Sequence, residues 1–194
     1  MTTTTSILLV GVGGQGAILT SKILSAGLIS RGYDLKMSEI HGMSQRGGSV
    51  TTQIKFGDKV YAPNIGLAEA DFLVSFEIVE ALRALPYLKP GGSLVTDDHE
   101  IYSMPVSAGF ATYPQGVAEE LKRLVPETTV VPAGTMAAEL GNIRVQNIVL
   151  LGALVKVMGL TDIDWPALVA EYVPAKARDL NLKAFDAGLK YSGR

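Results

Sequence analysis

The amino-acid sequence predicts an α/β protein of three layers, an α/β/α sandwich in which helices cover both faces of a mostly parallel, mixed sheet. Three observations lead to this prediction. An apolar run at 7–10 enters a glycine-rich turn, and apolar residues then recur at helical spacing over 16–30. Apolar runs and helical segments continue to alternate as far as residue 131. The chain after Pro132 is mostly helical, so we expect a helical C-terminal part.

The second and third strands depart from a regular alternation of strands and helices. A strand is expected at 35–40, at the distance typical of a βαβ unit, and another at 49–56, where β-branched and polar residues alternate. Because no helical segment separates them, a hairpin-like β-loop-β unit is the simplest account. The fold therefore has a Rossmann-like start that leads into a hairpin.

Apolar runs bounded by turn residues predict the remaining elements. Pro90, Gly91 and Gly92 indicate a turn. The length of 194 residues is that of one α/β domain, and we expect 1–194 to form a single domain. The further strands are expected at 72–76, 93–96 and 128–131, and the further helices at 77–85, 115–124, 144–158, 165–172 and 175–190.

Composition and charge exclude several classes of function. The net charge is −2 and the basic residues are scattered, which argues against nucleic-acid binding. Met1–Ser6 carries no basic residue, so we expect no signal peptide and a cytoplasmic protein. The apolar stretch Ile148–Leu160 contains Lys156 and is shorter than the roughly 20 residues that span a bilayer, so a buried core helix is expected there and no membrane contact.

Cysteine is absent from the sequence. Disulfides, thiolate catalysis, and iron–sulfur or zinc sites held by thiolates of this chain are therefore excluded. Apolar residues make up 47% of the chain and charged residues only 19%. This composition leaves apolar surface that a partner subunit could cover.

The turn between the first strand and the first helix is the best candidate for a ligand site. Gly11, Gly13, Gly14, Gln15 and Gly16 follow the pattern G-x-G-x-x-G in the context where it has a mechanism. Small residues permit close backbone approach, and a helix N-terminus attracts an anion. We predict that the turn binds a phosphate-bearing ligand, to which Gln15 could donate. Alternatively the glycines only let helix and strand pack closely, and Gln15 caps the helix.

The loop at 41–48 brings further groups suited to phosphate. Arg46 offers a guanidinium fork, and Ser44 and Gln45 offer side-chain hydrogen bonds. Gly47 and Gly48 permit close backbone approach. The alternative is an exposed turn whose Arg46 forms a surface ion pair.

Other polar residues give weaker signals. Glu39 stands near the end of the second strand, where a dinucleotide-binding domain places the acidic residue that holds the ribose. His41 has no companion at metal-ligand spacing and is expected to be a hydrogen-bonded loop residue. The run Asp97–Glu100, which includes His99, is expected to be a solvated loop. We assign no metal site and no catalytic residue to this chain.

Three motifs in this order carry a family resemblance that covers the whole chain. They are the glycine turn at 11–16, the loop His41–Gly48, and the late apolar helix segment Asn147–Leu154. Together they resemble the gamma-type subunits of 2-oxoacid:ferredoxin oxidoreductases, most closely the small (beta) subunit of the branch that acts on indolepyruvate. Asn147 itself is expected to be a structural hydrogen-bonding residue.

The resemblance implies a subunit of an enzyme that decarboxylates a 2-oxoacid, expected to be an aryl pyruvate, and forms acyl-coenzyme A while reducing ferredoxin. It places thiamine diphosphate, magnesium and 4Fe-4S clusters on a larger partner subunit, in a heterodimer or heterotetramer. The missing cysteines agree with this, and Gly57-Asp58 is followed by Lys59 rather than completing a thiamine-binding GDG pattern. Contact with coenzyme A is carried onto residues of the two glycine-bearing segments: Gly13, Gly14, Gln15, Gly16, Ser44, Gln45 and Arg46.

Two other interpretations stay open at this point. A free-standing oxidoreductase could bind NAD or FAD at the glycine turn with help from Glu39. A non-catalytic adaptor domain could use both turns for packing alone.

Overall fold

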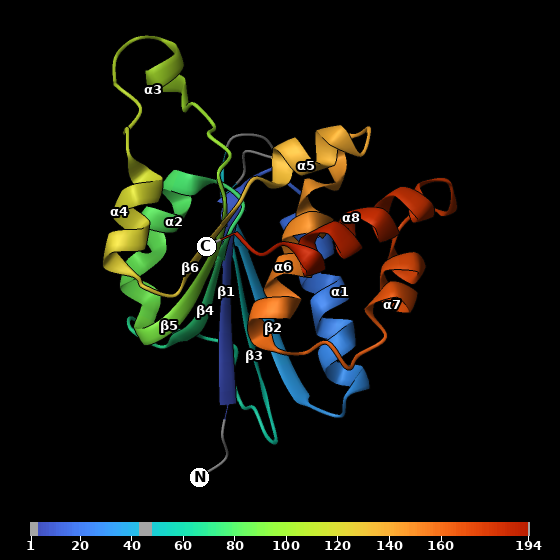
Figure 1. Ribbon diagram of the computed structural model, residues 1–194. Coiled ribbons are helices and arrows are strands. Elements are labelled where there is room, and N and C mark those ends of the chain that lie inside the picture. The colour runs from blue at the N-terminus through green and yellow to red at the C-terminus, as the bar shows by residue number, and fades with distance from the viewer. Residues whose placement is uncertain (1–3, 43–47, 194) are drawn as a thin grey trace.

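The computed structural model describes residues 4–42 and 48–193 (Figure 1). Helices are interspersed among the strands as far as β6, except that β2, β3 and β4 follow one another without a helix between them. Short 3₁₀ turns lie at Leu85–Tyr87, Ile143–Val145 and Ala175–Ala177. The strands are β1 Thr4–Val12, β2 Asp34–His41, β3 Ser49–Gly57, β4 Ala70–Ser75, β5 Leu88–Asp97 and β6 Thr128–Val131. The helices are α1 Ala17–Ser30, α2 Ile78–Ala84, α3 Met104–Ser107, α4 Val117–Leu124, α5 Ala133–Glu139, α6 Gln146–Met158, α7 Trp165–Tyr172 and α8 Arg178–Lys190.

The six strands form one mixed sheet in the order β2-β3-β1-β4-β5-β6, which confirms the predicted α/β class and sheet type. β1, β4, β5 and β6 are parallel, whereas β3 is antiparallel to both β1 and β2. The β-loop-β unit is confirmed, and its third strand lies between the first two. As a result β2 is an edge strand and does not pair with β1.

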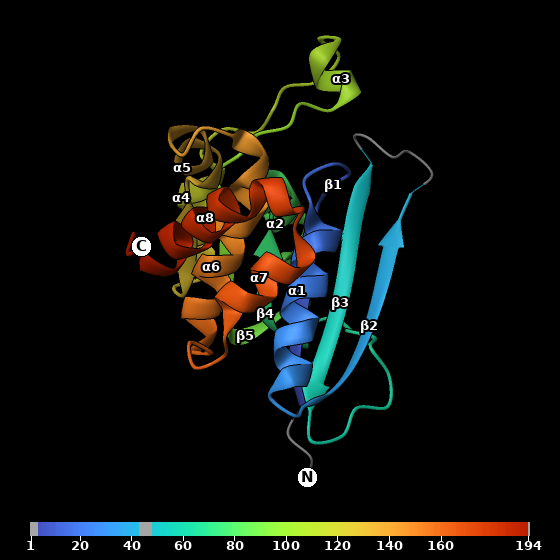
Figure 2. The same ribbon diagram turned by 90° about the vertical axis from the view of Figure 1, so that its right-hand side faces the viewer.

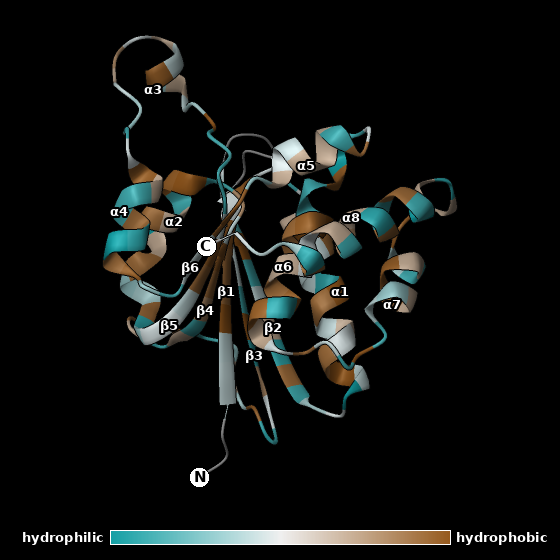
Figure 3. Cartoon of the chain, viewed as in Figure 1, coloured by the Kyte–Doolittle hydropathy of each residue, from teal (hydrophilic) through white to brown (hydrophobic). Residues whose placement is uncertain are grey.

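Alternation along β1 explains why both faces of the central sheet are covered by helices. Ile7 and Leu9 belong to a core cluster that includes residues of α1 and α6, whereas Leu8 and Val10 belong to a second cluster with residues of α2 and α4. Figures 1 and 2 show these two helical layers on opposite sides of the sheet. In Figure 3 the upper part of β1 is brown, whereas its N-terminal end is pale.

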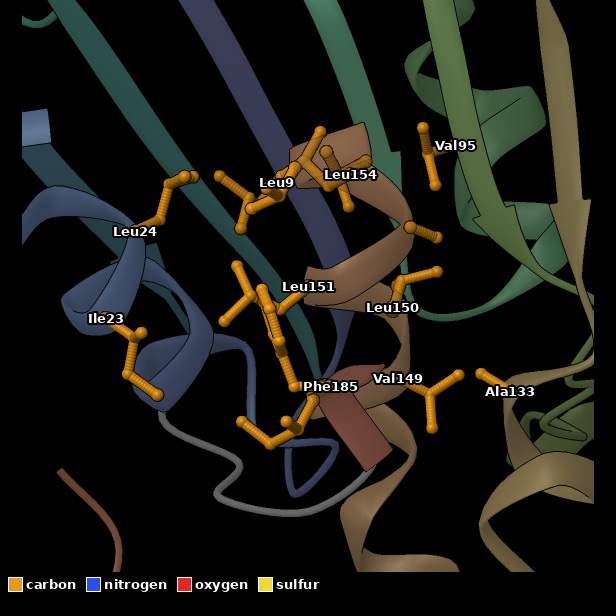
Figure 4. Packing of buried hydrophobic residues seen from close by; sticks show 14 of the residues in the cluster. Leu9, Ile23, Leu24, Val95, Ala133, Val149, Leu150, Leu151, Leu154 and Phe185 are labelled. Carbon is orange, nitrogen blue, oxygen red and sulfur yellow. The ribbon is translucent and has the colours of Figure 1, made fainter. Parts of the chain in front are cut away.

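Helix α6 is the buried helix that the apolar stretch at 148–160 predicts. Its side chains fill the core between the sheet and α8, where Leu154 lies near Leu9 and Phe185 comes from α8 (Figure 4). Gly152 of α6 and Gly188 of α8 let the two helix backbones meet directly, because a Cβ on either would overlap backbone atoms of the other helix. In the part of the chain that the structure describes, every helix is too short or too polar to cross a membrane.

One predicted turn is wrong. Pro90, Gly91 and Gly92 lie inside β5, which begins at Leu88. The register of β5 against β4 shifts between Ala70 and Phe72, so the strand accommodates the irregular backbone, including a positive φ of 77° at Gly91. Turn-forming residues here mark a bulge-like irregularity within a strand.

Candidate functional site

A cavity of about 480 Å³ lies at the glycine turn. The turn supplies one wall from Val12 to Ile18, and His41, Gly42 and Val50 supply the other from the ends of β2 and β3. The structure therefore brings together three of the predicted glycines, Gln15 and His41. Gly11 does not line this cavity: it lies within β1, where a Cβ would meet Phe76 Cβ at 3.0 Å.

The N-terminus of α1 opens into this cavity without a capping side chain among the described residues. Gly16 is the N-cap with a φ of 83°, and the first turn contains no acidic residue. The first N–H groups of a helix have no acceptor within the helix, and the helix dipole places positive potential there. The arrangement suits an anionic group of a ligand.

Gln15 has an internal role in the structure. Its side chain is 7% exposed; Oε1 accepts from Val12 N–H at 2.8 Å, and Nε2 donates to the Phe76 carbonyl at 2.5 Å. The amide therefore ties the turn after β1 to the residue that follows β4. It does not cap α1, and these bonds direct the amide inward.

Gly16 and Asn147 join the turn to helix α6. Asn147 Nδ2 donates to the Gly16 carbonyl at 3.3 Å, and Thr20 Oγ1 donates to the Asn147 carbonyl at 3.4 Å. A Cβ on Gly16 would lie 2.6 Å from Asn147 Nδ2. The buried amide is thus a structural hydrogen-bonding residue, as predicted, and Gly16 serves packing as well as the turn. Gly14 is different, because its φ is 102° and no described atom lies within 4 Å of a Cβ built there.

The last residue of the predicted loop at 41–48 contacts the glycine turn. Gly48 accepts a hydrogen bond from Gly13 N–H at 2.8 Å. The predicted binding residues Ser44, Gln45, Arg46 and Gly47 lie outside the described residues, and their roles stay predictions.

Glu39 does not occupy the place that a dinucleotide-binding site requires. It pairs with Thr52 across the β2–β3 hairpin, and its Oε1 accepts from Ser21 of α1 at 3.2 Å. Since β3 separates β2 from β1, the Glu39 carboxylate is one strand further from the glycine turn than in a doubly wound sheet.

Two buried carboxylates at neighbouring strand ends were not predicted as features of the site. Glu77 follows β4 and is 2% exposed, and Asp97 ends β5 and is 1% exposed. In the sequence, each is an acidic residue directly after a predicted strand, and this was the available signal for the site. The groups that hydrogen-bond to these carboxylates are distant in sequence, so their burial was not predictable. Asp97 Oδ1 accepts from Ala133 N–H at 3.1 Å, so the prediction that 97–100 is a solvated loop is wrong for Asp97. Burial, together with the nearby Asp98, raises the pKa of Asp97 to about 7.

Glu77, which follows β4, and the end of β1 lie at the point where neighbouring parallel strands are followed by helices on opposite faces of the sheet. The helix after β1 covers one face, and the helix after β4 covers the other. Such a switch point, at the carboxyl ends of parallel strands, is where open α/β sheets bind ligands. A second cavity of about 610 Å³ lies there, lined by Val12 and Glu77 and by residues that follow β5.

Comparison with known proteins gives consistent matches along the chain. The profile of the family described as pyruvate ferredoxin/flavodoxin oxidoreductase matches residues 6–191. Indolepyruvate oxidoreductase subunit IorB of Pyrococcus horikoshii is 42% identical over 95% of this chain and 94% of its own length. The gamma subunit of keto/oxoacid ferredoxin oxidoreductase from Geobacter sulfurreducens superposes with a TM-score of 0.69 at 26% identity, covering 96% of both chains. A chain of 2-oxoglutarate:ferredoxin oxidoreductase from Magnetococcus marinus superposes with a TM-score of 0.71 at 22% identity. The match covers 96% of this chain and 30% of that chain.

Proposed function

The chain belongs to the pyruvate ferredoxin/flavodoxin oxidoreductase family, and from this premise we propose that it is the small subunit of a 2-oxoacid oxidoreductase complex. The family profile covers 6–191, which supports the prediction of a single gamma-type domain. A larger subunit supplies thiamine diphosphate, magnesium and iron–sulfur clusters in this proposal. The absence of cysteine supports that division, because cluster ligands then have to come from another chain.

The proposed reaction is the oxidative decarboxylation of an aryl pyruvate such as indolepyruvate. The bond between the carboxylate and the keto carbon breaks and releases CO2, and the acyl group forms a thioester with the coenzyme A sulfur. Two electrons reduce ferredoxin, for which the clusters on the larger subunit would supply the route, and the thiol proton is released. The names of the relatives that are 34% to 42% identical support indolepyruvate as the substrate.

The glycine-turn cavity is proposed to contact a phosphate group of coenzyme A in the assembled enzyme. The single observation that carries this role is the uncapped N-terminus of α1 beside a cavity of about 480 Å³. The Magnetococcus marinus structure has coenzyme A and succinyl-CoA bound, and only this class of ligand is carried over to the present chain. The backbone N–H groups of Gly14 and Gly16 would make the contact, because Gly13 N–H already donates to the Gly48 carbonyl; Gly13 would permit close approach of the ligand. Ser44, Gln45, Arg46, Gly47 and Gly48 are proposed to complete it from the second segment.

A free-standing dinucleotide-binding enzyme is less well supported. The insertion of β3 moves β2 away from the glycine turn, and Glu39 is hydrogen-bonded to Ser21. Both features remove the acidic contact that a ribose requires in such a site.

The test of the proposed function is to isolate the chain with its larger subunit from cells that express both, and to assay the complex. We expect reduction of ferredoxin that depends on both indolepyruvate and coenzyme A, with the activity absent from the small subunit alone. The small subunit alone should bind neither NAD nor FAD in a titration followed by calorimetry. Stoichiometric dinucleotide binding by the isolated chain, or a complex inactive toward every 2-oxoacid tested, would contradict the proposal.

A further inference from the structure

A projecting segment between β5 and α4, residues 101–113, here called the arm, extends beyond the carboxyl edge of the sheet (Figures 1 and 2). The arm and the residues after it, from Ile101 to Ala118, contain no charged side chain. Its larger apolar side chains include Met104, which is 81% exposed, and Phe110, which is 88% exposed. Exposed apolar groups gathered on one uncharged projection are typical of surfaces that bind another protein.

The tip of the arm is held in one shape by its own backbone. Phe110 and Ala111 both donate N–H groups to the Pro105 carbonyl, at 2.8 and 3.2 Å, and Gly109 donates to the Val106 carbonyl at 3.0 Å. Gly109 has a φ of 77°, which reverses the chain after α3. A preorganised tip loses less conformational freedom when it binds, so these bonds favour docking of Phe110 as an anchor.

The base of the arm is clamped by the buried carboxylate of Glu77. Oε1 accepts from the Tyr113 hydroxyl at 2.5 Å and from Ile101 N–H at 3.2 Å, so one atom holds both ends of the arm. Oε2 accepts from Glu80 N–H at 2.8 Å and thereby fixes the carboxylate at the start of α2. Burial, together with the hydrogen bond to Glu77, raises the pKa of Tyr113 above its ordinary range, so its hydroxyl stays a donor.

The clamp is also connected to the glycine turn. Phe76, the neighbour of Glu77, accepts from Gln15 Nε2, and its N–H donates to the Val10 carbonyl at 3.0 Å. The position of the arm is therefore fixed relative to the proposed coenzyme A cavity through residues that are buried.

We propose that the arm docks on the larger subunit of the complex, with Phe110 and Met104 as its anchors, and that Glu77 positions it. The inference rests on the proposed function. The larger subunit is chosen as the partner because this fold covers only 30% of the Magnetococcus marinus chain. In that protein, a domain of this fold is therefore one part of a much longer polypeptide. Because the arm carries no charge, the surface that receives it is expected to be apolar.

The test compares Phe110→Asp with Tyr61→Asp in the assembled enzyme. Tyr61 is a matched control because it is 86% exposed and lies in the connection between β3 and β4. This connection begins beside the amino end of β1, whereas the arm lies beyond the carboxyl ends of the parallel strands. Association of each purified small subunit with the larger subunit is measured by calorimetry, after a thermal melt shows that the variant is folded. We expect Phe110→Asp to raise the dissociation constant at least 30-fold and Tyr61→Asp to raise it less than threefold, as hot-spot behaviour predicts.

Glu77→Gln is the second variant, and it separates positioning from direct contact. The amide keeps one acceptor oxygen, and its NH2 group faces either Ile101 N–H or Glu80 N–H. The first orientation releases one end of the arm, and the second loosens the start of α2 that fixes the side chain, so the arm should loosen in both. We expect weaker association and faster proteolysis within 101–113, with Phe110→Asp changing association alone. Equal association of all variants and wild type would overturn the proposal, as would an effect of Phe110→Asp only on self-association of the small subunit. A complex that assembles through the arm but oxidises no 2-oxoacid contradicts the proposed function and leaves the docking intact.

Discussion

Replacing Gly188 by alanine is expected to lower the free energy of unfolding by about 3 kcal/mol or more. The new Cβ would overlap the carbonyl oxygen of Val149 on α6 and press on Ala153 N. Because both neighbours are backbone atoms inside a helix, no side-chain rotation relieves the overlap, and α6 and α8 have to move apart. At roughly 2–4 °C per kcal/mol for a chain of this size, the melting temperature should fall by about 6–12 °C.

Gly134→Ala is the matched control for Gly188→Ala. Gly134 also lies in a helix, α5, but the nearest atom to a Cβ built there is Gln146 Oε1, at an ordinary 3.5 Å. Alanine is favoured over glycine in helices by up to about 1 kcal/mol, so this variant should be as stable as wild type or more stable. Urea unfolding followed by circular dichroism checks both variants. Equal stabilities would show that the contact between α6 and α8 is not the tight one described here.

Asp97→Asn is expected to stabilise the protein, by an amount that grows as the pH rises toward 7 and is constant above it. The pKa of Asp97 is about 7 in the folded chain, against an ordinary value of 3.8. Between pH 3.8 and pH 7 Asp97 is protonated in the folded chain but ionised in the unfolded chain. The free energy of unfolding of the wild type therefore falls as the pH rises through this range, and the full loss is reached above about pH 7. Asparagine stays neutral and can still accept from Ala133 N–H. At 1.36 kcal/mol per pH unit, the advantage of the variant should grow by roughly 2–3 kcal/mol from pH 5 to pH 8.

Glu120→Gln is the comparison for this pH dependence. The hydrogen bond from Arg123 lowers the pKa of Glu120, so its contribution is lost only as the pH falls below the ordinary carboxyl range. Its stability deficit should therefore stay constant between pH 5 and pH 8. Urea unfolding at the two pH values measures both variants, and a constant difference between Asp97→Asn and wild type would contradict the raised pKa.

Much of the fold follows from local patterns. The alternating residues of 49–56 predict a strand, and the largely apolar stretch at 148–160 predicts a buried helix, because burial repeats with the period of each element. The position of β3 between β2 and β1 was not predictable, since the same alternation fits either neighbour. Pro90 and Gly91 were misassigned because a shift in strand register uses the same residues as a turn.

The site was predictable where it depends on backbone geometry. A glycine turn between strand and helix has to place the N-terminus of α1 beside an open space. The inward amide of Gln15 depends on Phe76, and the clamp on the arm depends on Tyr113 reaching Glu77 across 36 residues. Contacts between residues so far apart come from tertiary packing and leave no local pattern in the sequence.

The central claim, that the glycine turn contacts a phosphate of coenzyme A, is tested most directly by comparing Gly14→Asp with Gly14→Asn in the assembled enzyme. No described atom lies within 4 Å of a Cβ at Gly14, and Asp and Asn have the same shape and tolerate positive φ similarly. Only the charge at the mouth of the cavity differs. A charge about 5 Å from a phosphate, at an effective dielectric constant of about 40, costs roughly 1.5 kcal/mol, or about tenfold. We predict a KM for coenzyme A about ten times higher in Gly14→Asp than in Gly14→Asn, with the KM for the 2-oxoacid the same in both. Equal KM values for coenzyme A in the two variants would contradict the claim.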